Sequence, residues 1–213
     1  TARALTQLLQ LAALQLANHP VNVERAAQGL PVANAVITRG PAHTDDMATI
    51  PVPRHQAAVV SGCRTVLGAA RLQGMHVVTS PRMTGSLDTD LHAKFAAVET
   101  LLTSWRTVVL HVKGADVAAH DCKPAEKRAY LERVDQALGA FLARRDEPLS
   151  VLVTADHGTS SRTGVHLYEP APVLLASWPL AENDPTSFTE ETALDVALGS
   201  VSATTLLDLL ETA

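Results

Sequence analysis

Apolar residues recur along this chain with two spacings, and each spacing predicts one type of element. Leucine and alanine side chains in residues 5–16 fall on one face of a helix, which His19-Pro20 is expected to end. Asn22 is expected to cap a second, short helix that stops near Gly29. The same periodicity predicts further helices at 63–73, 91–105, 124–145 and 203–210. Short, continuous apolar runs predict buried strands at 35–38, 57–60, 76–79, 107–112, 150–154 and 173–176.

The order of these elements predicts the fold class. Strands and helices alternate over most of the chain, which is typical of an α/β fold with a largely parallel sheet covered by helices. Residues 57–79 read as strand, helix and strand, with Gly74 as the helix stop, so we expect the two strands to pair in parallel. Asp88 or Asp90 is placed to cap the helix that follows. No internal repeat or low-complexity run is visible.

Composition narrows the functional classes. The chain has 213 residues, of which 46% are hydrophobic and 18% charged, enough for a core and one or two domains. A net charge of −5 argues against a nucleic-acid-binding protein, which usually carries a basic face. No apolar run approaches the length of a membrane span. Cys63 and Cys122 are far apart, so we expect no disulfide framework and a cytoplasmic location.

Polar residues with metal-ligand chemistry follow two of the predicted strands and the loop beyond them. Asp116 and His120 are four residues apart and would share one face of a helical turn. Asp156 and His157 are adjacent, so both can face one ion only where Gly158 breaks the strand. His166 follows a polar, turn-prone stretch. The carboxyl ends of strands in such sheets gather ligands, and imidazole and carboxylate suit Zn²⁺ or Mn²⁺. The alternative is a set of ordinary surface or core histidines.

These residues stand in an order that resembles a known superfamily. Asp116-x-x-x-His120, Thr154-Ala-Asp-His-Gly158 and His166-x-x-x-Pro-x-Pro172-Val resemble the C-terminal half of the alkaline phosphatase superfamily. Within it, the chain is most similar to the cofactor-independent phosphoglycerate mutases of the archaeal type. Further landmarks of that family occur in the same order at 19–25, 29–35, 39–40, 84–90, 188–190 and 198–199.

The resemblance implies a domain organisation and a set of ligands. Residues 1–85 would form part of an inserted substrate-binding cap domain, and residues 86–213 the C-terminal half of an alkaline-phosphatase-like core. Two divalent metal ions, Mn²⁺, Mg²⁺ or Zn²⁺, would be bound. Asp116, His120 and His166 would hold one ion, and Asp156 with His157 would contribute to the other.

The resemblance also implies substrate contacts. Asn34 and Arg39 would bind the phosphorylated three-carbon acid. Lys113 lies close in sequence to the metal ligands, and its ammonium group could hold a phosphate oxygen. For Arg39 and Lys113 a solvated surface side chain is the alternative.

The implied reaction is the glycolytic interconversion of 3-phosphoglycerate and 2-phosphoglycerate, an isomerase activity. Members of the family are roughly twice as long, and their N-terminal half carries a metal-binding aspartate and a nucleophilic serine that match no residue here. We therefore expect a C-terminal half that is inactive alone and that self-associates or binds a complementary N-terminal chain, but no nucleic acid or membrane. The alternatives are a phosphatase, phosphodiesterase or phosphonate hydrolase of the same superfamily, or a non-catalytic metal-binding or regulatory subunit.

Overall fold

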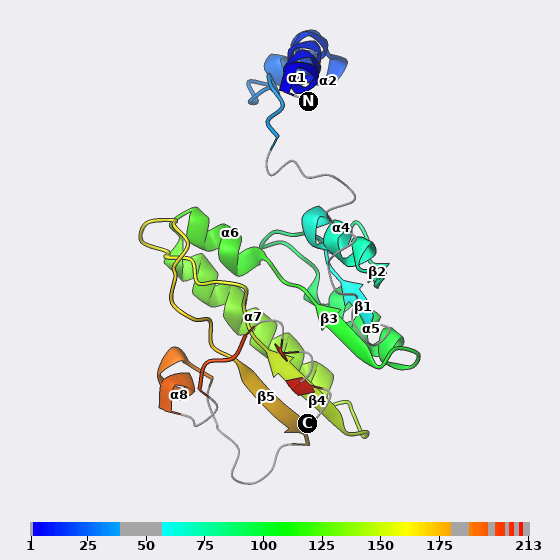
Figure 1. The fold of residues 1–213 in the computed structure, drawn as a ribbon, viewed down its shortest axis with the longest axis vertical. Coiled ribbons are helices and arrows are strands. Elements are labelled where there is room, and N and C mark those ends of the chain that lie inside the picture. Colours follow the sequence, from blue (N-terminus) through cyan, green and yellow to red (C-terminus); the bar gives the residue numbers. More distant parts are fainter. Residues whose placement is uncertain are drawn as a thin grey trace. The chain divides into compact units, whose positions relative to one another are not determined.

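The chain divides into two compact units, residues 1–50 and 51–213 (Figure 1). The structure is a computed structural model that describes residues 2–38, 57–179, 188–195, 199–202, 205–206 and 209–210. Among these residues no helix combines the length and apolarity needed to cross a bilayer.

The first unit consists of two helices and the segment that follows them. Helix α1 (Ala2–Ala17) confirms the apolar stripe of residues 5–16, and α2 (Pro20–Ala27) follows after a turn. The capping prediction for Asn22 is wrong, because His19 Nδ1 accepts the Val21 N–H and the helix begins earlier. The strand predicted at 35–38 is also wrong. That segment forms no regular element and has no strand partner among the described residues, and a strand requires a hydrogen-bonded neighbour.

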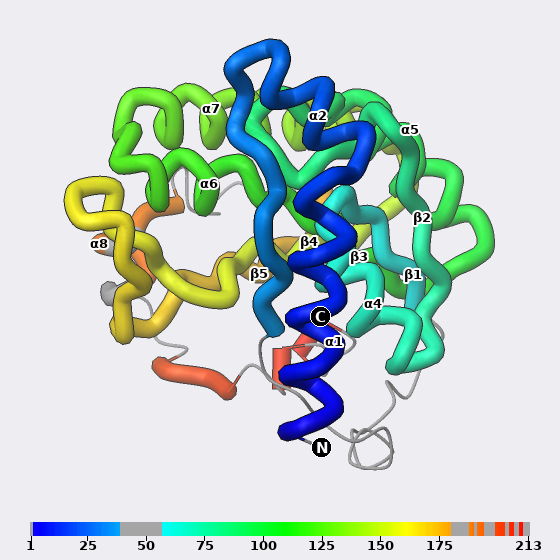
Figure 2. The backbone as a smooth tube through the Cα atoms, turned by 90° about the horizontal axis from the view of Figure 1, so that it is seen from above, coloured from blue at the N-terminus to red at the C-terminus, as the bar shows by residue number. Residues whose placement is uncertain are grey.

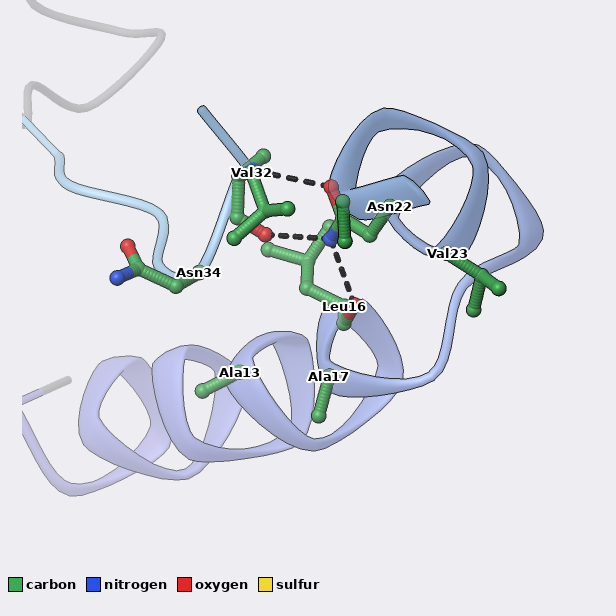
Figure 3. A pocket seen from close by; sticks show the side chains of 9 residues that line it. Ala13, Leu16, Ala17, Asn22, Val23, Val32 and Asn34 are labelled. Carbon is green, nitrogen blue, oxygen red and sulfur yellow. Dashed lines mark hydrogen bonds between the residues drawn. The ribbon is translucent and has the colours of Figure 1, made fainter. Parts of the chain in front are cut away.

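Asn22 instead ties the first unit together (Figure 3). Its buried amide Nδ2 donates to the carbonyl oxygens of Leu16 at 2.7 Å and Ala33 at 2.6 Å. Its Oδ1 accepts the Ala33 N–H at 3.0 Å. An asparagine side chain carries both donors and an acceptor, so one residue joins the end of α1 to the segment that follows α2.

A three-stranded parallel sheet in the order β2-β1-β3 lies in the second unit. Helix α4 (Arg64–Leu72) connects β1 (Ala57–Val60) to β2 (His76–Val78). Helix α5 (Leu91–Leu102) connects β2 to β3 (Thr107–Leu110). The predicted parallel β-α-β unit and the α/β class with a helix-flanked parallel sheet are confirmed. Gly74 ends α4 with a φ of 70°, and the Asp90 side chain caps α5 through the Ala93 N–H.

The remaining elements follow β3. They are α6 (Gly114–His120), α7 (Pro124–Leu142), β4 (Leu149–Val153), β5 (Leu174–Trp178) and α8 (Glu190–Asp195). Strands β4 and β5 pair antiparallel, unlike the first sheet, because their connection is a loop rather than the crossover helix that parallel pairing needs. Helix α8 was not predicted. Of the helix expected at 203–210, residues 203, 204, 207 and 208 lie outside the described residues.

The core of the second unit lies between the parallel sheet and the two long helices. It consists of Ala58, Val60, Met83, Leu91, Phe95, Val98, Leu101, Ala137 and Phe141. The rings of Phe95 on α5 and Phe141 on α7 have centroids 5.4 Å apart. This packing fixes α7 against α5, so that the short α6, which lies against α7 (Figure 2), is held at the carboxyl end of β3.

The contact-based division of the chain differs from the expected domain boundary. The boundary between the two compact units falls between Ile50 and Pro51, whereas the sequence predicts a domain boundary after residue 85. Strands β1 and β2 come before that residue but share a sheet with β3, which explains why residues 57–85 group with the rest of the second unit. The assignment of a cap domain stays a prediction.

Close packing at the start of α6 generates a stability prediction. A Cβ atom on Gly114 would lie 2.4 Å from Cε2 of the buried Tyr130 on α7, so Gly114→Ala must displace the ring or the helix. We expect it to lower the free energy of unfolding by about 1–3 kcal/mol in urea denaturation. Gly139→Ala is the matched control, because nothing lies within 4 Å of that Cβ on the exposed face of α7. It should raise stability by about 0.5–1 kcal/mol. Equal effects would contradict the packing argument.

Candidate metal centre

Three chain segments deliver the predicted ligands to one place. Helix α6 begins four residues after the end of β3 and presents Asp116 and His120. The loop from β4 to β5 carries Asp156 and His157 at its start and folds back so that Thr159 and His166 form an antiparallel bridge. This loop runs beside α6 (Figure 1), where His120 Nδ1 is 2.7 Å from the Gly164 oxygen.

Four of the five predicted ligands lie together. Ligand atoms of Asp116, His157 and His166 are all within 4.8 Å of one another. His120 Nε2 is 3.1 Å from His166 Nε2 and 3.3 Å from Asp116 Oδ1. The fifth predicted ligand, Asp156, is highly exposed to solvent. Its side chain is 88% exposed, and its Oδ2 lies 3.5 Å from His157 Nε2. The structure therefore brings both His120 and His157 to Asp116 and His166.

The donor set fits a divalent ion. Because a carbonyl oxygen only accepts, the short contact to Gly164 places a proton on Nδ1 of His120. A neutral ring then directs the lone pair of Nε2 toward Asp116 and His166, an arrangement usual for metal-binding histidines. Two nitrogens each about 2.0–2.1 Å from a tetrahedral ion lie roughly 3.3 Å apart, close to the 3.1 Å between the two Nε2 atoms.

Asp116 accepts hydrogen bonds from two side chains outside the set of predicted ligands. Its Oδ2 accepts from Lys113 Nζ at 2.5 Å, and its Oδ1 accepts from the Thr159 hydroxyl at 2.9 Å. Burial alone would raise the pKa of Asp116, but the hydrogen bonds from Lys113 and Thr159 and the nearby positive charge outweigh it and lower the pKa. The hydrogen bond to Asp116 in turn raises the pKa of Lys113. Lys113, expected to contact substrate, is thus paired with a candidate ligand.

A second set of polar side chains at the strand ends, Lys94 and His111, was not predicted from the sequence. Lys94 is fully buried, and its Nζ donates to the backbone oxygens of Thr84 and His111. Burial lowers the pKa of Lys94. Burial, followed by the charge of Lys94, also lowers the pKa of His111. The signal was its position: Lys94 lies three residues after Leu91 on the apolar stripe of α5.

Ser61 belongs to the same group and is structural. Its hydroxyl is fully buried, lies 3.0 Å from His111 Nδ1 and accepts the Cys63 N–H at 3.0 Å. Gly62 packs so closely on the next loop that a Cβ would lie 1.8 Å from the Met83 oxygen. A serine enclosed in this way has no open side from which a substrate could reach it, so the Ser61–His111 pair is not a nucleophile with its base.

The predicted substrate contacts Asn34 and Arg39 are not tested by the structure. Asn34 lies in the first unit, where it lines a mainly apolar pocket and its amide points away from Asn22 (Figure 3). Arg39 lies outside the described residues.

The Lys113–Asp116 pair predicts a pH dependence in chelator-treated protein. The lowered pKa of Asp116 means that its contribution to stability is present above the unfolded value of 3.8 and lost as pH falls through the folded value. The raised pKa of Lys113 means that its contribution is present below the unfolded value of 10.5 and lost as pH rises through the folded value. Lys113→Met should therefore reduce the free energy of unfolding between these limits.

The expected loss is small, a few tenths to about 1 kcal/mol, because the pair is partly exposed. Urea denaturation at several pH values measures it. Lys123→Met is the control, since Lys123 contacts only exposed carboxylates on Asp121 and Glu126 among the described residues. If Lys113→Met loses the same stability at pH 2.5 as at pH 7, the stabilising partner is not Asp116.

Comparisons with known proteins place nearly all of the second unit in one family. Residues 55–212 match the family model described as the metalloenzyme superfamily. The 2,3-bisphosphoglycerate-independent phosphoglycerate mutase of Picrophilus torridus is 33% identical over 178 residues, which are 83% of this chain and 44% of that protein. Phosphoglycerate mutase 1 of Archaeoglobus fulgidus is 30% identical over 98% of this chain and 52% of its own length. The chain spans about half the length of the curated relatives it matches.

Solved structures agree with this match. The PH0037 protein from Pyrococcus horikoshii superimposes with a TM-score of 0.80 and 30% identity, over 99% of this chain and 56% of that one. The cofactor-independent phosphoglycerate mutase from Thermoplasma acidophilum gives a TM-score of 0.54 over 99% of this chain and 50% of that chain. At 21% identity this second likeness shows the fold alone.

Proposed function

The chain belongs to the metalloenzyme superfamily, and we propose that it is the C-terminal half of a cofactor-independent phosphoglycerate mutase. The observation that carries the proposal is the convergence of Asp116, His120, His157 and His166 from α6 and the β4–β5 loop. Relatives that match across most of the chain are named as mutases of this kind. The reaction would interconvert 3-phosphoglycerate and 2-phosphoglycerate in glycolysis, in the cytoplasm.

Two divalent ions, with manganese as one candidate, would be held by the predicted ligands. When bound, such ions polarise a phosphoryl oxygen and neutralise charge that develops during transfer. In the proposed division, Asp116, His120 and His166 serve one ion and Asp156 with His157 the other. The Gly164 oxygen holds His120 with Nε2 directed inward, so this ligand needs little reorientation.

The remaining residues would bind the substrate. Lys113 places an ammonium group 2.5 Å from Asp116 Oδ2, beside the proposed ions, where it can donate to a phosphate oxygen. Asn34 and Arg39 would contribute an amide and a guanidinium, which suit a carboxylate or phosphate. These assignments rest on the family resemblance of the positions.

The proposal requires a partner for the missing half. The aspartate and serine expected in family members match no residue here, and the chain covers only 44–52% of the two mutases compared above. Strands β2, β3, β4 and β5 each have one edge without a partner strand among the described residues. A free edge offers backbone donors and acceptors to another chain. A complementary N-terminal chain, or self-association through these edges, would satisfy them.

Metal binding is the first test. Dialysis followed by elemental analysis, and calorimetric titration with Mn²⁺ or Zn²⁺, should show near-stoichiometric binding by the wild type. The His120→Ala/His166→Ala double variant should lose most of it, because two nitrogen ligands are removed. His92→Ala, which removes an exposed histidine on α5, is the control. Affinity should fall below about pH 6, where imidazoles protonate. Equal metal content in wild type and double variant would contradict the assignment.

Activity is the second test. These 213 residues alone should not interconvert phosphoglycerates at a normal rate, because no group carries the phosphoryl between the two positions. Loss of a covalent nucleophile typically leaves a rate several orders of magnitude lower. Adding a chain that supplies the missing aspartate and serine should restore turnover, measured by coupling to enolase with Mn²⁺ and without 2,3-bisphosphoglycerate.

Asp116→Asn in the mixture is the control and should abolish the restored activity. A complemented enzyme that hydrolyses phosphate esters but does not isomerise phosphoglycerate would make the protein a phosphatase of the superfamily. Metal binding without either activity would favour the regulatory subunit. Full turnover by the isolated chain would reveal a nucleophile within it.

A further inference from the structure

We propose that Thr159 is a positioning residue that sets both a carboxylate and an imidazole of the metal centre, an inference that rests on the proposed function. Thr159 follows Asp156-His157-Gly158 directly and is 5% exposed. Its hydroxyl donates to Asp116 Oδ1 at 2.9 Å and lies 3.2 Å from His157 Nδ1. A single buried oxygen thus contacts candidate ligands that are 41 positions apart in the sequence (157 − 116 = 41).

The hydrogen count fixes the direction of each bond. A hydroxyl has one proton to donate and two lone pairs to accept with. An ionised carboxylate only accepts, so the proton of Thr159 goes to Asp116. The contact between Thr159 and His157 then needs a proton on Nδ1 of the imidazole. The Gly158 oxygen, 3.2 Å from the same Nδ1, accepts only and requires the same tautomer.

These hydrogen bonds leave the His157 imidazole in the tautomer that can bind a metal through Nε2. With Nδ1 protonated, the lone pair of neutral His157 is on Nε2. The same logic holds for His120, whose Nδ1 proton goes to the Gly164 oxygen. Groups that accept from the outer nitrogen fix the tautomer and raise the basicity of the inner one. In His120 a backbone oxygen does this alone, whereas in His157 the Thr159 hydroxyl shares the task and orients Asp116 as well.

The backbone of Thr159 is fixed independently of its hydroxyl. Thr159 forms an antiparallel bridge with His166, and the Leu167 N–H donates to the Gly158 oxygen at 2.9 Å. From α7, Lys127 Nζ donates to the Thr159 oxygen at 3.0 Å. Because these contacts involve only backbone atoms of residues 158 and 159, replacing the hydroxyl should leave the loop in place and disturb the ligands selectively.

A pair of variants separates the hydroxyl from the packing of the side chain. Thr159→Val keeps the shape of the side chain but leaves Asp116 Oδ1 without its donor and His157 with only the Gly158 oxygen. Thr159→Ser keeps the hydroxyl and removes the methyl group. Removing an outer-shell partner of this kind typically costs about 10–100-fold in metal affinity. We expect that loss for the valine variant and near wild-type affinity for the serine variant.

The experiment uses the full chain and Zn²⁺ as the probe. Calorimetric titration at pH 7.5, with a competing chelator, measures affinity for the wild type, both variants and Thr163→Val, an exposed threonine of the same loop as control. Thermal unfolding of the metal-free proteins reports folding. Long-range ¹H–¹⁵N spectra of the imidazole nitrogens, also on metal-free protein, report the His157 tautomer, which should be Nδ1–H in wild type and serine variant and mixed in the valine variant.

Each outcome has a distinct meaning. Selective loss of affinity and a mixed tautomer in Thr159→Val support the role. Equal affinity and the same tautomer in wild type and Thr159→Val overturn it, with the proposed function intact. Equal losses in the valine and serine variants, accompanied by lower thermal stability, overturn it in favour of packing. A wild type that binds no Zn²⁺ overturns the proposed function and the metal-positioning role together.

Discussion

The carboxylate of Asp116 is the group on which the candidate metal centre depends. Its side chain is only 20% exposed, and a negative charge withdrawn from water must be compensated by nearby donors or cations. Oδ2 receives the ammonium of Lys113, and Oδ1 receives the hydroxyl of Thr159 and faces His120. These partners come from both α6 and the β4–β5 loop. The need to satisfy one carboxylate therefore holds the loop, with its histidines, against the helix.

Contacts elsewhere in the second unit position the helix α6 that carries Asp116. Helix α6 can begin at Gly114, four residues after the end of β3, because this glycine leaves room for the ring of Tyr130. The backbone oxygen of His111, three residues before α6 begins, accepts a hydrogen bond from the buried Lys94 of α5. Among the described residues the Lys94 ammonium donates to backbone oxygens and not to a carboxylate, so burying its charge costs desolvation energy. These two hydrogen bonds join the end of β3 to the loop at Thr84. The core cluster and these polar contacts together set the start of α6.

The sequence predicted local features well and long-range ones poorly. The spacing of Asp116 and His120 predicts a shared helical face, and α6 confirms the helix because that periodicity depends only on neighbouring residues. The position of Lys94 on the apolar stripe indicated burial, but the partners of Thr159 and Lys94 are 43 and 17 positions away and could not be predicted from local spacing. The strand expected at 35–38 failed for a related reason. Apolar, β-branched residues favour extended backbone, but pairing depends on a neighbour that the pattern of one segment cannot supply.

The charges of the site indicate why the proposed two-metal centre would need further anions. Asp116 and Asp156 bring two negative charges, Lys113 brings one positive charge, and the histidines are neutral when they ligate, so the predicted residues sum to −1. Two divalent ions would add +4. Such an excess of positive charge at a partly buried position is unfavourable unless further anions approach. A carboxylate and a nucleophilic oxygen from a complementary chain would supply part of the compensation, and a phosphate group the rest. The proposed partner and the proposed substrate would thus both supply the negative charge that the two ions require.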